Sequence, residues 1–251
     1  MISIKHLSFS YTKDKSVLDD ISFDILDGEC VVLLGPNGVG KSTLISCILG
    51  ENKPKTGDMC FDNRNFNEIS NKEKSRYLAY VPQLIDGNEL TVEETITLGR
   101  LPYFYIAPTK EDKEKVNEII NRFGLDSIRD KSTNEISGGE RQKVAIARAF
   151  VQEAKVVVFD EPTSNLDIKS QLSILTLIKE NSKKDNRSAL ISIHDINQAL
   201  TVGDKFVFLK DNKIYKVCNK KDISKELLEA VYEVKINIIN TEKGDVIVYE
   251  N

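Results

Sequence analysis

The sequence predicts an α/β fold with an N-terminal antiparallel β part and an inserted helical part. Apolar runs at 30–34 and 156–159 have the length and composition of buried parallel strands. Residues 2–11 and 17–26 cluster or alternate apolar side chains, which is typical of antiparallel strands. The stretch from about 84 to 152 is mostly helical in its periodicity, so we expect it to be inserted between two halves of the α/β lobe.

Further elements follow from turn residues and caps. Thr109 can cap a helix that places Val116, Ile119, Ile120 and Phe123 on one face and stops at Gly124. The other expected elements are a turn at Thr12–Lys15, a helix at Lys41–Leu49 ended by Gly50, strands at 189–193 and 205–209, a helix near 222–233, and a hairpin of 234–240 and 245–249 turned at Lys243-Gly244-Asp245. We expect one domain, 1–251, with a core lobe of 1–83 and 153–251 and a helical subdomain of 84–152.

Composition narrows the class of protein. The 251 residues are 40% hydrophobic and 29% charged, which is the ordinary composition of a soluble globular protein. The net charge of −4 leaves no overall basic surface for nucleic acid. No apolar run approaches the ~18 residues of a membrane span, and the N-terminus lacks the apolar region of a signal peptide. The four cysteines are not paired at metal-ligand spacing, so we expect free thiols in a reducing cytosol.

Residues 35–43, Gly-Pro-Asn-Gly-Val-Gly-Lys-Ser-Thr, match the phosphate-binding loop pattern directly after an apolar strand. The glycines let backbone N–H groups turn inward around phosphates. Lys41 adds a charge toward the β- and γ-phosphates, and the Ser42 hydroxyl is placed to ligate Mg²⁺. The following helix directs its positive end at the anion. The loop alone leaves open which nucleotide hydrolase or kinase carries it.

A second motif, Ile-Ser-Gly-Gly-Glu-Arg-Gln at 136–142, precedes a helical stretch. Ser137 before two glycines predicts a helix N-terminus that can bind an anion, although an ordinary helix cap has the same pattern. The strand at 156–159 then ends in Asp160 and Glu161, where open α/β sheets bind ligands. Because successive strand side chains point to opposite faces, we expect these two carboxylates to do different jobs.

Taken together, these motifs resemble the ATP-binding subunit of an ABC transporter over essentially the whole chain. The order and spacing match: the phosphate loop, Gln83, the signature at 136–142, the acidic strand end, Ser-Asn-Leu-Asp at 164–167, and His194. Two departures are small. Ile136 replaces the usual Leu of the signature, and Glu140 replaces the usual Gln. Both departures leave Ser137 and the glycines of the signature in place.

The resemblance implies a role for each motif. Tyr11 stacks on the adenine, Glu161 is the general base, and His194 contacts the γ-phosphate and orients the attacking water. Gln83 takes part in catalysis and is the hinge between the lobes. ATP is bound by Tyr11, Gly35, Pro36, Asn37, Gly38, Val39, Gly40, Lys41, Ser42 and Thr43, and Mg²⁺ by Ser42, Gln83 and Asp160.

The resemblance also implies partners. Two copies of the chain sandwich two ATP molecules, with Ser137, Gly138, Gly139 and Glu140 completing the site of the opposite copy and Asp167 at the dimer seam. Integral membrane permease subunits are separate chains, and an extracytoplasmic substrate-binding protein takes part indirectly. The chain is then peripheral, at the cytoplasmic face of the cell membrane. The aromatic stretch 99–106 is a candidate dock for the permease, with internal packing as the alternative.

Four stretches, at 90–100, 166–171, 194–199 and 227–234, resemble the ATPases of importers for ferric siderophores, haem and cobalamin. Tyr103 departs from that group, which often has His there. We therefore expect import of an iron chelate, with cobalamin, zinc or manganese as alternative cargoes. Two other classes are weighed against this one: a soluble ABC-type ATPase acting on nucleic acid, which needs long inserts or a second ATPase unit, and a non-enzymatic regulator, which would lack Glu161.

Overall fold

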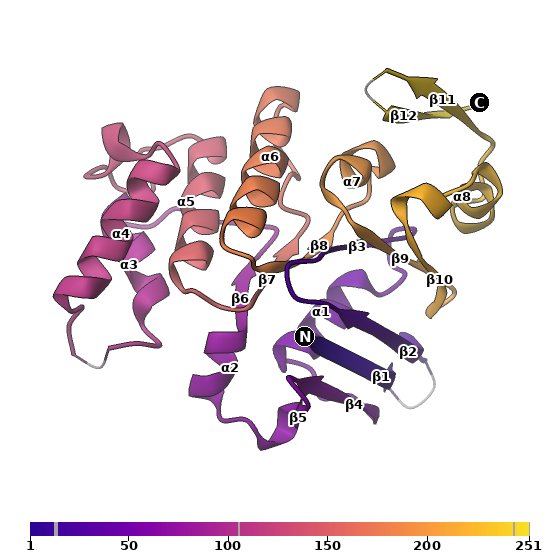
Figure 1. Cartoon of the computed structure of the whole chain (residues 1–251), viewed down its shortest axis with the longest axis horizontal. Helices are drawn as coiled ribbons and strands as arrows, with labels where there is room; N and C mark the ends of the chain where they lie inside the picture. The colour runs from indigo at the N-terminus through magenta and orange to yellow at the C-terminus, as the bar shows by residue number, and fades with distance from the viewer. Residues whose placement is uncertain (13–14, 105, 243, 251) are drawn as a thin grey trace. The chain divides into compact units, whose positions relative to one another are not determined.

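The computed structural model describes residues 1–12, 15–104, 106–242 and 244–250. The chain forms two compact units, one from residues 1–68 and 190–251 and the other from residues 69–189. The strand β8 (Ser188–Ser192) carries the chain from the second unit back to the first. Figure 1 labels the elements of both units.

The first unit begins with an antiparallel sheet whose strands run in the order β2-β1-β4-β5. Its strands are β1 (Ile2–Phe9), β2 (Leu18–Ile25), β4 (Thr56–Phe61) and β5 (Arg64–Asn65). Ile2 pairs with Ile25 and Ile4 with Phe23, and all four side chains are buried on one face. Burial alternates along β2 from Ile21 to Ile25, which is typical of an antiparallel strand, and the two predicted strands are confirmed. Lys13 and Asp14 of the predicted turn lie outside the described residues.

A parallel strand pair in the same unit leads into the phosphate loop. The strand β3 (Cys30–Leu34) is buried at every position and pairs in parallel with β9 (Lys205–Lys210). The strand β10 (Lys213–Asn219) continues from β9 as an antiparallel hairpin. The helix α1 (Lys41–Leu49) follows β3 and ends at Gly50, as the sequence predicts. The predicted strand at 205–209 is likewise confirmed.

The first unit ends in short elements, which lie in the orange to yellow part of the chain in Figure 1. These are α7 (Ile196–Val202), α8 (Lys225–Tyr232) and the hairpin of β11 (Ile236–Thr241) and β12 (Gly244–Tyr249), with the short 3₁₀ helices η1 (Phe66–Glu68) and η4 (Lys220–Asp222) elsewhere in the unit. The predicted helix near 222–233 and the hairpin are confirmed, but Lys243 of the predicted turn lies outside the described residues.

The second unit is mostly helical around one parallel pair of strands, β6 (Leu78–Val81) and β7 (Val156–Asp160). Its helices are α2 (Asn71–Tyr77), α3 (Val92–Thr97), η2 (Leu98–Arg100), α4 (Lys110–Arg122), η3 (Asp126–Ile128), α5 (Gly138–Val151) and α6 (Ile168–Lys184). Thr109 caps α4 through a reciprocal pair of contacts with Asp112, and Gly124 follows the helix in the left-handed conformation, as predicted. Within the described chain, no helix combines the length and apolar character of a membrane span.

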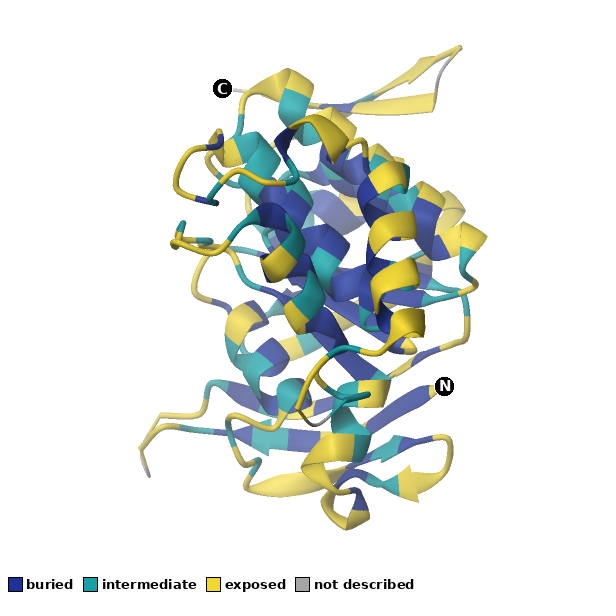
Figure 2. Cartoon of the chain, turned by 90° about the vertical axis from the view of Figure 1, so that its left-hand side faces the viewer, coloured by how far each residue is buried: buried dark blue, intermediate teal, exposed yellow. Residues whose placement is uncertain are grey.

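The helices of the second unit bury one face each, which Figure 2 shows as dark blue along one side of a helix and yellow along the other. The helix α5 is buried from Val144 to Val151 except at Arg148, and α4 contributes Val116, Ile119 and Ile120. These residues are spaced by three and four, so hydrophobic burial, rather than helix propensity, holds the bundle together.

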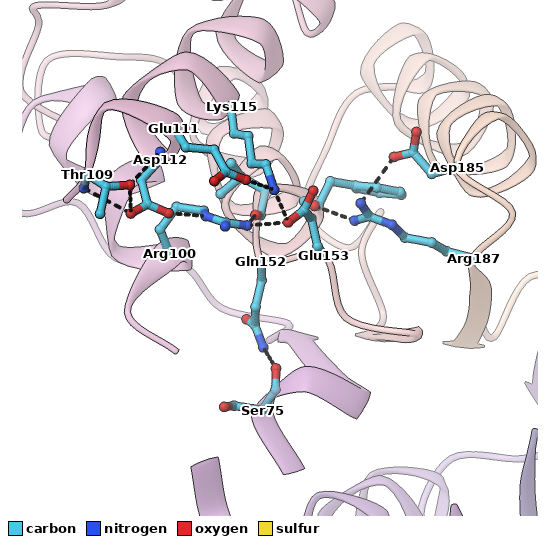
Figure 3. Close-up of polar contacts among 12 residues, drawn as sticks. Ser75, Arg100, Thr109, Glu111, Asp112, Lys115, Gln152, Glu153, Asp185 and Arg187 are labelled. Carbon is cyan, nitrogen blue, oxygen red and sulfur yellow. Dashed lines mark hydrogen bonds and ion pairs between the residues drawn. The ribbon is translucent and has the colours of Figure 1, made fainter. Parts of the chain in front are cut away.

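A buried ion network lies inside this bundle (Figure 3). The Arg100 guanidinium donates to Asp112 Oδ1 at 2.9 Å and to Glu153 Oε2 at 2.6 Å, and both Arg100 and Asp112 are almost fully buried. Lys115 Nζ adds a second cation 2.8 Å from Glu153. Burial alone would raise the pKa of Asp112, but hydrogen bonds from Thr109 and Arg100 outweigh it and hold that pKa below its usual value. Arg100 is therefore an internal residue and not a surface anchor.

Removing one member of this network should be costly. Asp112→Ala leaves the buried Arg100 charge without a partner on α4 and removes the cap contact, so we expect a loss of about 3–5 kcal/mol in the free energy of unfolding. Because the pKa of the folded carboxyl is lowered, this contribution exists above pH ~4 and fades as the pH falls below that value. Urea unfolding at pH 7 and at pH 3 measures both effects.

The matched control is Glu114→Ala on the same helix. Glu114 pairs with Lys110 at 3.7 Å, and both side chains are exposed, so its loss should leave stability unchanged. Equal stability of the two variants would contradict a structural role for the network.

Candidate nucleotide site

The loop between β3 and α1 is pressed against the neighbouring strand β9. Gly35 has φ +144°, and a Cβ built on it would lie 2.3 Å from the carbonyl oxygen of Leu209. Gly40, with φ +107°, has no room either, because a Cβ there would lie 2.9 Å from Leu18 Cδ2. Only glycine fits both positions. The pattern that predicts a phosphate loop is therefore also a packing requirement of this fold.

Lys41 turns back over the loop. Its side chain is buried, and Nζ donates to the carbonyl oxygen of Gly35 at 2.8 Å and to that of Pro36 at 3.2 Å. The ammonium group is thus held on the loop by two backbone acceptors, at the start of α1. A compact cation in this position attracts the terminal phosphates of a nucleotide.

The helix α1 differs from the other α-helices in its first turn. Its N-cap is Gly40, which has no side chain to accept a hydrogen bond from the first turn. Every other α-helix of the described residues has a side-chain cap, at Ser70, Thr91, Thr109, Ser137, Asp167, Asp195 and Ser224. A helix N-terminus without a side-chain cap, beside a lysine, fits a phosphate group, since N–H groups and dipole both favour an anion there.

Tyr11 lies on the surface of the same unit. Its side chain is 67% exposed, and its hydroxyl is 3.3 Å from Thr43 Oγ1 in the first turn of α1. Phe9 supports the ring edge-to-face, with the centroids 4.9 Å apart. An exposed aromatic ring is available for stacking, whereas a core residue would not be.

The acidic strand end lies in the second unit. Asp160 is the last residue of β7 and is buried. Glu161 follows in the left-handed conformation, with φ +45°. The strand ends at Asp160, so the alternation of strand side chains does not extend to Glu161. Gln83 Nε2 donates to Glu161 Oε2 at 2.8 Å, which joins two of the predicted site residues.

Ser137 caps α5, as predicted, through a reciprocal contact with Glu140. The Ser137 hydroxyl donates to Glu140 Oε2 at 2.7 Å, and the backbone N–H of Ser137 donates to the same oxygen at 2.9 Å. These two hydrogen bonds hold the pKa of Glu140 below its usual value, so the carboxylate is charged at neutral pH. This negative charge lies at the N-terminus of α5, which the sequence analysis predicts can bind an anion.

Asp167 caps the next helix of the same unit. Its carboxylate accepts from the Ser170 N–H at 3.0 Å and from the Ser170 hydroxyl at 2.6 Å. The starts of α5 and α6 line one cavity of about 340 Å³, whose lining residues are Ser137, Gly139, Glu140, Lys143, Asp167, Lys169, Ser170, Ser173 and Ile174. The motif analysis gave no role to Lys143, which directly follows the signature at 136–142, or to Ser170, which lies within the stretch 166–171. The spacing Asp-x-x-Ser is a capping signal that points to Ser170.

His194 lies in the first unit, between β8 and α7, and is exposed. The residue before it is fixed, because the Ile193 N–H donates to the carbonyl oxygen of Leu33 at 3.2 Å. The residue after it, Asp195, caps α7 and accepts from the Gln198 N–H at 3.0 Å. His194 is therefore held between two anchored neighbours, one strand away from the phosphate loop in the same unit.

Comparisons with known proteins agree with this geometry. A family model described as ABC transporter matches residues 18–164. The uncharacterised ABC transporter ATP-binding protein MJ0089 of Methanocaldococcus jannaschii is 40% identical over 248 residues, which is 99% of this chain and 97% of that relative. The ferric enterobactin transport ATP-binding protein FepC of Escherichia coli is 30% identical over 94% of this chain and 88% of its own length.

A solved structure extends the likeness to the fold. The ATP-binding cassette MJ0796, in a dimeric post-hydrolysis state bound to ADP and Pi, superposes with a TM-score of 0.76 at 27% identity, covering 87% of this chain and 98% of the other. The predicted fold class is confirmed.

Proposed function

This chain belongs to the ABC transporter family as an ATP-binding subunit, and we propose that it is the ATP-hydrolysing motor of an importer for an iron chelate. The assignment of nucleotide binding rests on the start of α1, which lacks a side-chain cap and has the Lys41 ammonium group beside it. In this assignment the loop residues 35–43 bind the phosphates of ATP, and Tyr11 stacks on the adenine.

The hydroxyl of Ser42, the carboxylate of buried Asp160 and the amide of Gln83 would hold Mg²⁺. Oxygen ligands of this kind suit a small hard cation, which when bound neutralises phosphate charge. Within the described residues no group of three or more His, Cys, Asp or Glu side chains could hold a metal by itself. This fits a cation that completes its shell with phosphate oxygens and water.

Glu161 would take the proton from the attacking water. The Gln83 amide donates to one oxygen of the carboxylate, which orients the group, and a carboxylate so oriented can accept a proton from water. The exposed imidazole of His194 would hold the water in line with the γ-phosphate. Since Gln83 also opens the helical insertion, its contact with Glu161 would link the catalytic base to the segment proposed to meet the permease.

Replacing Glu161 with Gln should separate binding from turnover. The amide keeps an acceptor oxygen for Gln83 but cannot take a proton, so we expect ATP affinity to persist and turnover to fall about 10²–10⁴-fold. The variant should then accumulate as an ATP-bound dimer in size-exclusion chromatography. Lys41→Ala is the control, because it should lose ATP binding altogether. Normal turnover of Glu161→Gln would refute the role of Glu161.

A second copy of this chain would complete each site. Ser137, Gly138, Gly139 and Glu140 of one copy would face the nucleotide bound to the other, in place of the arginine finger of other nucleotide hydrolases, and Asp167 would lie at the seam. The dimeric MJ0796 structure with ADP and Pi supports this arrangement. The exposed position of Ser137 and Asp167 at the starts of two neighbouring helices also supports it.

Glu140 should weaken the site that it helps to form. Its carboxylate accepts the hydrogen bond of the Ser137 hydroxyl and places a negative charge where the γ-phosphate would approach. Glu140→Gln removes the charge, so the ATP concentration that gives half-maximal dimer should fall about two- to fivefold, the size of a one-charge change at a helix end. Analytical ultracentrifugation in a Glu161→Gln background measures it.

The control is Glu135→Gln, because Glu135 makes a similar contact with the Ser132 N–H, at 2.9 Å, outside the helix start. An unchanged or higher ATP requirement for Glu140→Gln would show that Glu140 is only a helix cap.

The permease subunits would dock on the second unit. That unit exposes large apolar side chains on the insertion: Leu84, Leu90, Leu98, Leu101 and Ile106, the last of them 98% exposed. Apolar side chains with polar surroundings mark interaction surfaces. The chain would then lie at the cytoplasmic face of the membrane as a peripheral subunit, with the extracytoplasmic binding protein reached only through the permease. Action on nucleic acid is disfavoured by the net charge of −4.

The cargo assignment rests on kinship. FepC, which is named for ferric enterobactin transport, shares 30% of its residues with this chain. A strain that lacks this chain should therefore lose uptake of radiolabelled iron supplied as one ferric chelate, and the wild-type gene should restore it. Normal iron uptake together with lost uptake of cobalamin, zinc or manganese would overturn the cargo and leave the ATPase assignment standing.

A further inference from the structure

The C-terminal hairpin of β11 and β12 is a small two-stranded sheet with one covered face. Ile236 and Ile247 are buried, whereas Ile239, Val246 and Val248 on the other face are exposed. A two-stranded sheet is marginally stable by itself. Its position therefore depends on the helices that it contacts in the same unit, α7 and α8 (Figure 1).

Asn197 attaches this hairpin to α7. Its Nδ2 donates to the carbonyl oxygen of Ile247 at 3.0 Å, and its Oδ1 accepts from the Ile247 N–H at 2.8 Å. One amide side chain thus satisfies both backbone groups of a strand residue, as a neighbouring strand would. On the α8 side, the Ile236 N–H donates to Glu229 Oε1 at 3.0 Å.

Asn197 lies in the first turn of α7, two residues after the cap Asp195 and three after His194. The helix is only seven residues long, and so short a helix depends on its cap and on tertiary contacts for stability. Ile196, Ala199 and Leu200 are buried and keep the helix on the core. The two bonds of Asn197 add an anchor at the end nearest to His194.

We propose that Asn197 and the hairpin position His194 for hydrolysis. On one side of His194, Ile193 is tied to β3 through Leu33. On the other side, the first turn of α7 is tied to the hairpin through Asn197. Loss of the two hydrogen bonds between Asn197 and Ile247 lets the first turn of α7 and the His194 imidazole move, while the core and the phosphate loop stay in place. The inference rests on the proposed role of His194 in ATP turnover.

The test compares Asn197→Ala with Thr201→Ala, a control on the same helix, whose hydroxyl donates to the carbonyl oxygen of Gln198 at 2.7 Å. Asn197→Ala should lower kcat for ATP about ten- to a hundredfold, the range that misplacement of a catalytic group produces, with the KM for ATP unchanged. Thr201→Ala should keep both values. A fall in kcat with a matching rise in KM, or unchanged kcat, would overturn the proposal.

A truncation that ends at Val234 removes the hairpin and keeps α8. It should lower kcat as Asn197→Ala does, and adding Asn197→Ala to the truncated chain should have no further effect, because both changes break the same tie. Additive losses would contradict the link. His194→Ala distinguishes the proposed role of His194 in turnover from its positioning by Asn197. If ATP turnover persists in His194→Ala, the role of His194 is refuted. If turnover is lost in His194→Ala but normal in Asn197→Ala, only the positioning role of Asn197 is refuted.

Discussion

The contact between the phosphate loop and β9 is the constraint on which the first unit depends. At Gly35 the backbone passes so close to Leu209 that no side chain fits, and the parallel pairing of β3 with β9 sets that separation. Packing against β9 therefore restricts the shape of the loop, and Lys41 lies against its carbonyl groups. Preorganised donors and charges of this kind need no rearrangement to receive a phosphate.

The helices of this chain differ in how their first turns are capped. Most helix starts are satisfied by their own side chains, which is the ordinary solution for exposed N–H groups. The start of α1 has no side-chain cap, whereas the start of α5 is capped by Ser137 and Glu140. In the proposed dimer, the Glu140 carboxylate would compete with an incoming phosphate, so the contact between the two copies would be weaker and easier to reverse after each cycle.

Much of this could be predicted from short-range pattern. The phosphate loop, the caps at Thr109 and Ser137, and the strands β3 and β7 follow from local spacing, because caps and alternation involve residues close in sequence. The pairing of Gln83 with Glu161 joins residues 78 positions apart, and no local pattern in the chain carries it. The buried position of Arg100 could not be predicted for the same reason, since it depends on contacts with Asp112 and Glu153.

The sequence by itself determined which residues can meet a nucleotide, since the motifs prescribe residue types at fixed spacings along the chain. Only the tertiary structure decided how they are held. The left-handed turn at Glu161, the buried partners of Arg100 and the attachment of β12 to Asn197 each depend on contacts between distant segments. Such contacts form when the packed core brings those segments together. In a single sequence the polar residues are visible, but their partners are not.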